Sequence, residues 1–184
     1  MDKNRAFTIT EVLISSTILV LALTSVLGVF VMTKWLYTFS LAQANLQRDA
    51  TMIAEKIIIR NPIKEELGIY GLRSAKSFAI PITTPTGSEI DFVGTDGLTR
   101  KYFLSGKSII YQSPTQSPNQ IAIYTAPANV AITLLFSEPI TRFDGEARLD
   151  HETVMVYVAV SQNLAGKTAA GSVLTYVNLR NIQR

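Results

Sequence analysis

The chain has 184 residues, of which 47% are hydrophobic and 17% are charged, and its formal net charge is +3. This length fits one domain, or one domain with an appendage. The absence of cysteine excludes a disulfide framework, a thiolate metal site and a cysteine nucleophile. The mild positive charge is scattered, so we expect no nucleic-acid partner. Four basic residues that fall near one another are explained by a solvated surface: Arg60, Lys64, Arg73 and Lys76.

A long apolar run begins close to the N-terminus. The segment Val12–Thr33 contains no charged residue, and about 20 mainly apolar residues suffice for a helix to cross a membrane. The next residues, Lys34–Tyr37, supply the cationic and aromatic side chains that favour a membrane interface. Because Lys3 and Arg5 precede the run, we expect the N-terminus to stay in the cytoplasm.

Three interpretations compete for this run. One is a cleaved secretory signal, since Ala42–Ala44 offers a small-x-small cleavage site. The run is longer than a signal core, however, and bulky side chains fill residues 35–39 before that site. The second is a plain membrane anchor, and the third depends on Glu11.

Glu11 is a carboxylate placed immediately before the apolar run, where a charge is unfavourable without a partner. One explanation is local. The residues Thr8–Glu11 fit a capping box, in which the glutamate accepts a hydrogen bond from a free backbone donor at the start of the helix. A carboxylate also suits the positive end of the helix dipole.

The surrounding residues add a second explanation. Ala6–Ile14, AFTITEVLI, resembles the processing motif of type IV prepilins and type II secretion pseudopilins. In that family a short basic leader ends in a small residue and is cut before a phenylalanine, and a glutamate occupies the fifth mature position. The resemblance implies cleavage between Ala6 and Phe7, N-methylation of Phe7, and an assembly role for Glu11. Ala6 stands where glycine is usual.

The resemblance implies a structural subunit of a pilus-like filament, either a minor pilin or a pseudopilin, and not an enzyme. Its expected partners are a prepilin peptidase, other pilins or pseudopilins, an inner-membrane assembly platform and membrane lipid. We expect a single-pass inner-membrane protein with its head in the periplasm or outside the cell. The alternative is a membrane-anchored receptor or binding domain, whose leader stays intact. An anchored enzyme would need a catalytic constellation around His151, and no motif provides one.

The helical pattern continues beyond the membrane segment. Apolar residues recur at steps of three and four through residues 36–60, which predicts an amphipathic second half. Asn61-Pro62 then predicts the end of a helix that runs through residues 7–60 after a leader of residues 1–6. Gly28 lies where major pilins of this family often carry a helix-breaking proline. The helix either loosens there during assembly, or the glycine is merely one of the many found in membrane helices.

From residue 61 to residue 184 the pattern changes to alternation and turns, which predicts a β-rich head. Residues 63–75 are expected to form a short helix or an irregular link, Thr84–Gly87 a turn, and residues 112–120 a loop. The predicted strands are Phe78–Ile82, Glu89–Val93, Lys101–Leu104, Ser108–Tyr111, Ile121–Tyr124, Ala131–Phe136, Val154–Val160 and Val173–Leu179. A long helix followed by strands predicts an α+β fold, with the helix packed on an antiparallel sheet. The resemblance implies that this fold is pilin-like.

The acidic stretch around His151 is a weak candidate for a metal site. Its acidic residues are Asp144, Glu146, Asp150 and Glu152. The spacing does not match an EF-hand loop, and a solvated loop explains the stretch more simply. Some secretion pseudopilins bind calcium in a head loop, so the resemblance makes calcium the one cofactor to consider, and otherwise we expect none.

Overall fold

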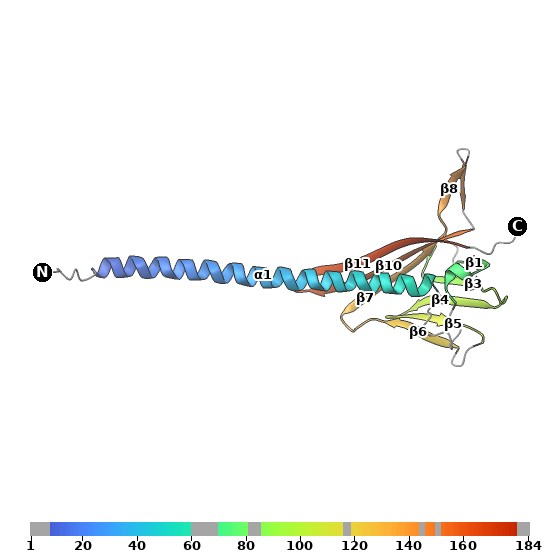
Figure 1. Cartoon of the computed structure of the whole chain (residues 1–184), viewed down its shortest axis with the longest axis horizontal. Helices are drawn as coiled ribbons and strands as arrows, with labels where there is room; N and C mark the ends of the chain where they lie inside the picture. The colour runs from blue at the N-terminus through green and yellow to red at the C-terminus, as the bar shows by residue number, and fades with distance from the viewer. Residues whose placement is uncertain are drawn as a thin grey trace. The chain divides into compact units, whose positions relative to one another are not determined.

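A computed structural model describes residues 8–59, 70–80, 86–115, 119–143, 146–149 and 152–179, with side chains outside the description at 86–87 and 140–149. The fold is α+β, as the sequence predicts: one long N-terminal helix packs against antiparallel sheets (Figure 1). The chain divides into two compact units, Met1–Leu41 and Ala42–Arg184.

Helix α1 spans Ile9–Ile58 without interruption and ends two residues before the predicted end. Hydroxyl side chains inside its apolar run do not break it, because they donate back to the carbonyl oxygens of the preceding turn. Ser16 and Thr17 both donate to the Leu13 carbonyl, at 2.9 and 2.8 Å, and Ser25 donates to Leu21 at 2.8 Å. The hydroxyl groups of these three residues are therefore satisfied within the helix itself.

Sheet A has five strands in the order β1-β3-β4-β5-β6, and each pair is antiparallel. Its strands are β1 (Ser77–Ala79), β3 (Glu89–Val93), β4 (Thr99–Ser105), β5 (Ser108–Gln112) and β6 (Gln120–Thr125). Gly106, with φ of 59°, makes the tight turn of the β4–β5 hairpin that the sequence predicts.

Sheet B has four strands in the order β11-β10-β7-β2. Its strands are β2 (Thr86–Gly87), β7 (Val130–Ser137), β10 (Thr153–Leu164) and β11 (Lys167–Asn178). The last two form a hairpin through Ala165 and Gly166, which both have positive φ, as tight hairpin turns require. A separate hairpin joins β8 (Ile140–Phe143) to β9 (Glu146–Leu149).

The second half of α1 forms one wall of the head core. Its buried residues fall on one stripe of the helix: Leu46, Ala50, Ile53, Ala54 and Ile57. Sheet A contributes Phe92, Tyr102 and Tyr111 to the core, and sheet B contributes Phe136 and the alternate valines of β10. Burial of these side chains is the main source of stability, at about 1.5–3 kcal/mol for each large one.

Polar contacts hold α1 to an edge strand of each sheet. On one flank of the buried stripe, Lys56 donates to the Ile123 carbonyl at 3.2 Å, and Tyr124 donates to Asp49 at 3.0 Å. Both bonds reach β6, the edge strand of sheet A. The helix thus satisfies one backbone carbonyl of this edge strand and holds one of its side chains.

The opposite flank of the stripe holds β11, the edge strand of sheet B. The Gln47 side-chain amide donates to the Ser172 carbonyl and accepts from the Ser172 amide, each at 3.0 Å. The strand approaches so closely that a Cβ on Gly171 would lie 2.2 Å from the Gln47 backbone nitrogen. Glycine is therefore required at this contact, and Figure 1 shows β10 and β11 running beside this part of α1.

Several sequence predictions need correction. Thr86 and Gly87 were expected in a turn, but they form β2, because β7 offers an antiparallel partner at Ser137 and Phe136. The final hairpin is longer than predicted, since β10 extends to Leu164 and β11 begins at Lys167. Strands β8 and β9 were not predicted. Of the segment 63–75, the described part contains a short 3₁₀ helix at Leu72–Ser74.

Candidate functional site

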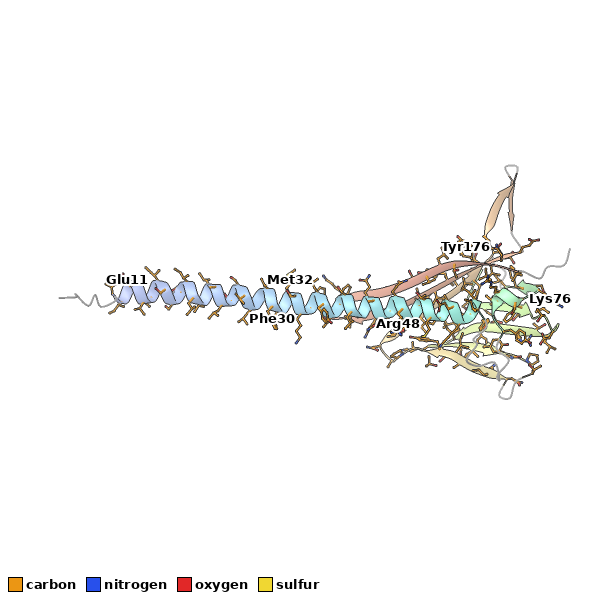
Figure 2. All side chains as sticks on the ribbon, in the orientation of Figure 1. Glu11, Phe30, Met32, Arg48, Lys76 and Tyr176 are labelled. Atoms are coloured by element: carbon orange, nitrogen blue, oxygen red, sulfur yellow. The ribbon has the colours of Figure 1, made fainter. Side chains whose placement is uncertain are left out.

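The first half of α1 carries a continuous apolar surface that no described part of the chain covers. Its large apolar side chains from Val12 to Met32 are 54% to 67% exposed. Figure 2 shows side chains such as Phe30 and Met32 standing out from the helix on its own. By length and composition this helix could cross a membrane. An apolar surface of this size is not stable in water, so it needs lipid or another protein.

Glu11 closes the capping box that the sequence predicts. Its Oε2 accepts hydrogen bonds from the Thr8 backbone amide at 2.9 Å and from the Thr8 hydroxyl at 3.0 Å. In return the Thr8 hydroxyl accepts from the Glu11 amide at 3.3 Å. The local explanation of Glu11 is thus confirmed. The cap fixes the start of the helix and holds the carboxylate at the edge of the apolar run.

Gly28 lies inside a regular stretch of α1, and nothing lies within 4 Å of a Cβ placed on it. The helix continues through this position with no break. A loosening of the helix at Gly28 during assembly stays a prediction.

The remaining sequence candidates fall mostly outside the described residues. This applies to the cleavage and methylation residues Ala6 and Phe7, and to Asp144, Asp150 and His151 in the acidic stretch. Glu146 begins β9, but its side chain is not described. Among the described residues, no group of three histidine or acidic side chains is arranged to hold a metal ion.

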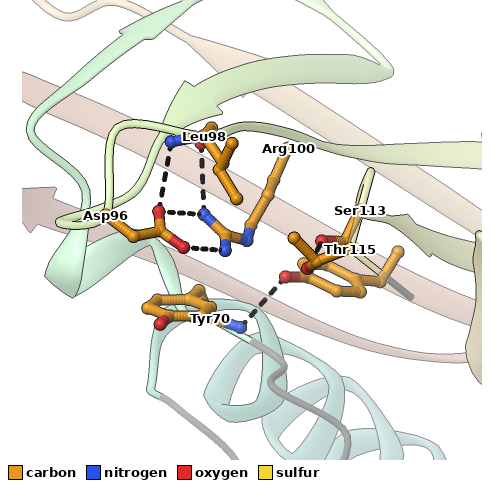
Figure 3. Close-up of polar contacts among 7 residues, drawn as sticks. Tyr70, Asp96, Leu98, Arg100, Ser113 and Thr115 are labelled. Carbon is orange, nitrogen blue, oxygen red and sulfur yellow. Dashed lines mark hydrogen bonds and ion pairs between the residues drawn. The ribbon is translucent and has the colours of Figure 1, made fainter.

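The head contains a buried charged cluster centred on Arg100, which the sequence did not predict. Arg100 is 2% exposed and donates to both carboxylate oxygens of Asp96, at 2.7 Å for Nη1 to Oδ1, and to the Leu98 carbonyl at 3.1 Å (Figure 3). These bonds lower the pKa of the Asp96 carboxyl to about 2, so the pair stays ionised. The pair braces the turn between β3 and β4.

Tyr70 connects this cluster to the point where the described chain resumes after α1. Its ring lies 3.9 Å from the Arg100 guanidinium, a cation–π contact. Its backbone amide donates to the Tyr111 hydroxyl at 3.2 Å, and its carbonyl accepts from the Tyr102 hydroxyl at 2.7 Å. The cluster therefore ties the chain to sheet A. Its only signal in the sequence is an Asp and an Arg four residues apart.

An open pocket of about 320 Å³ lies next to the cluster, at one end of sheet A. Its lining includes Asp91, Lys101, Gln112 and Asn119. Lys101 forms ion pairs with Glu89 and, at 3.5 Å, with Asp91. Opposite charges therefore already neutralise each other there, and the geometry offers no pairing of a nucleophile with a base.

The most distinctive feature is thus the capped apolar half of α1, whose length and composition suffice to cross a membrane. No protein-family model matches the chain, and no curated protein or solved structure is significantly similar to it.

Proposed function

We propose that the chain is a subunit of a type IV pilus-like filament, in the manner of a minor pilin or a type II secretion pseudopilin. One observation carries the proposal: a single uninterrupted helix has an uncharged, uncovered apolar first half and a second half built into a β-rich head. The capped Glu11 at the start of that helix and the leader-like residues before it support the same function.

The apolar surface explains how such a subunit works. In the membrane, lipid covers the residues 12–33, and every backbone group is bonded within the helix. In a filament, like helices replace the lipid, so the gain in hydrophobic free energy is small. Close packing and polar contacts must then decide which subunits are incorporated.

Glu11 supplies such a polar contact. Both hydrogen bonds of the cap use Oε2. A carboxylate has a second oxygen, so the new α-ammonium on Phe7 of a neighbouring subunit can add through Oε1 without breaking the cap. Pairing the two charges relieves the penalty of an isolated carboxylate in an apolar filament core.

The decisive experiment is the N-terminal mass of the chain expressed with a prepilin peptidase. A mature chain that begins at N-methyl-Phe7 is the expected result. A chain that still begins at Met1 would sink the proposal and favour a plain anchored receptor. A chain that begins at Asn45 would mean that the apolar run is only a secretory signal.

A variant of Glu11 separates its proposed role in charge pairing from its role in the helix cap. Glu11→Gln keeps an oxygen acceptor for the cap but removes the charge, so we expect filament incorporation to fall at least about tenfold, a loss of about 1.4 kcal/mol. Glu55→Gln is the matched control, because it makes the same change at an exposed carboxylate on the same helix. If Glu11→Gln is incorporated as well as the wild type, charge pairing does not select subunits.

A further inference from the structure

Sheet B has an outer face that points away from α1 and the core. Along β10 the buried residues alternate with partly exposed ones, and β7 and β11 follow the same alternation. The cross-strand register aligns Leu135, Tyr157 and Leu174 in one row across the three strands. Met155 and Tyr176 form the next row. The centre of this outer face is therefore apolar and aromatic.

The outer face carries no charge over its three described strands. Between the two apolar rows and the turn of the β10–β11 hairpin, its side chains are alanine, serine, threonine and, next to the turn, Asn163. Leu174 and Tyr176 remain 51% and 59% exposed, and Figure 2 shows Tyr176 projecting from β11. The solvent-exposed face of an antiparallel sheet normally carries polar residues. Aromatic residues, methionine and a lack of charge are instead typical of the cores of protein interfaces.

The outer face of sheet A shows the contrast within the same head. There Asp91 lies opposite Lys101, and Glu89 lies on the same face of the sheet. This charged row makes the outer face of sheet A more polar than that of sheet B, although Phe103 and Ile110 also lie on it. Both sheets bury their other face in the core, so the difference between their outer faces is not a requirement of the fold.

The open edge of sheet B offers a second route for association, but it is partly closed. Gln47 occupies the outward amide and carbonyl of Ser172, in the middle of β11. A partner strand cannot pair along β11 without displacing this side chain. Any partner of sheet B is therefore expected to dock on its face, not its edge.

We propose that the outer face of sheet B binds the same face of a second copy of this chain. Charged groups on a partner surface would lose their hydration against this face and would gain no ion pairs in return. In this head, sheet A presents charges, and the exposed side of α1 presents Arg48 and Glu55. The outer face of sheet B is uncharged and apolar, so a second copy of the same face suits it. A two-fold axis brings two such faces together as a sheet-on-sheet contact.

The size of the face limits the area that the dimer can bury. Three strands spaced by about 4.8 Å, with about 3.3 Å per residue along the β10–β11 pairing, give the outer face an area of roughly 500 Å² per copy. The total of roughly 1,000 Å² lies below the range of about 1,200–2,000 Å² for stable specific interfaces and is typical of weak, transient ones. The dimer is therefore weak in dilute detergent and favoured where the copies are concentrated in a membrane. It does not depend on leader processing.

Cross-linking of the full chain in membranes tests the dimer, because the native chain has no cysteine. Ala159→Cys lies on the central strand of the face, next to the expected two-fold axis. A bismaleimide that spans about 10 Å, the usual separation of packed sheets, should join two copies. Thr99→Cys, exposed on the outer side of sheet A, is the control and should yield at least about fivefold less dimer.

A charge placed on the face gives a second, independent test. Leu174→Lys in the Ala159→Cys background should lower the cross-linked fraction at least about fivefold, whereas Thr99→Lys in that background should leave it unchanged. Unchanged thermal unfolding of the Leu174→Lys chain shows that the fold is intact, as expected for an exposed edge-strand residue. Absence of the dimer at Ala159→Cys, cross-linking only to a different protein, or insensitivity to Leu174→Lys would each overturn the proposal.

Discussion

The two halves of α1 have the same backbone geometry but opposite surroundings. Before Leu41 the helix keeps its apolar side chains exposed all around, and after Ala42 it buries one narrow stripe and leaves the other sides polar. A helix that is apolar all round suits lipid or a helix bundle, whereas a single stripe suits a sheet. The comparison shows that one helix can carry two surface patterns. One pattern suits packing within the head, and the other suits surroundings outside the chain. Four predictions test it.

The largest contrast is expected between two isoleucines on this helix. Ile53 is fully buried and Ile18 is exposed, so the same truncation removes core packing at one site only. Ile53→Ala should lower the free energy of unfolding of the head by about 2–5 kcal/mol, and Ile18→Ala by less than about 0.5 kcal/mol. Denaturant unfolding in detergent, followed by circular dichroism, measures both. Equal losses would contradict the division into two halves.

Two glycines sharpen the comparison. Gly171→Ala places a Cβ against the backbone of α1, so it should destabilise the head by about 1–3 kcal/mol. Gly28→Ala meets no atom within 4 Å and should raise the helix propensity of the first half by about 0.5–1 kcal/mol without changing head stability. If Gly171→Ala unfolds like the wild type, β11 does not approach α1 so closely. A filament defect in Gly28→Ala would support loosening of the helix there.

Gln47 tests the polar contact on the β11 flank. Gln47→Ala removes two hydrogen bonds to Ser172 and should cost about 1–2 kcal/mol of unfolding free energy. It should also speed hydrogen exchange of the Ser172 amide. Gln43→Ala, one turn earlier and exposed, is the control and should change neither quantity. Normal protection at Ser172 in the Gln47→Ala chain would refute the contact.

The smallest effect concerns pH on the β6 flank. Partial burial and then the Asp49 carboxylate raise the pKa of Tyr124 from 10.0 to about 12. The unfolded chain loses this proton near pH 10 while the folded chain keeps it, so the contribution is complete below pH 10 and lost as the pH rises to 12. Tyr124→Phe should lower stability by about 1 kcal/mol at neutral pH and flatten the decline between pH 10 and 12. An unchanged profile would exclude the contact.

Sequence periodicity was sufficient to predict α1, the sheet strands Glu89–Val93 and Ser108–Tyr111, and the cap at Glu11. These features depend on neighbours a few residues apart. Strand β2 could not be predicted, because Thr86 and Gly87 have turn-forming composition and become a strand only by pairing with β7. Arg100 was missed for a similar reason: its burial depends on Tyr70, a partner distant in the sequence, and a lone arginine normally indicates a surface.

The contact between Gln47 and Ser172 also bears on the order of folding. The two residues are 125 positions apart, and the partner strand lies near the end of the chain. During synthesis, the apolar stripe of α1 emerges first and must wait for β11 before that flank is covered. Closing so long a loop is slow. A chain truncated before β11 would therefore leave this flank of the stripe accessible to chaperones and proteases, which gives the cell a simple signal that the head is incomplete.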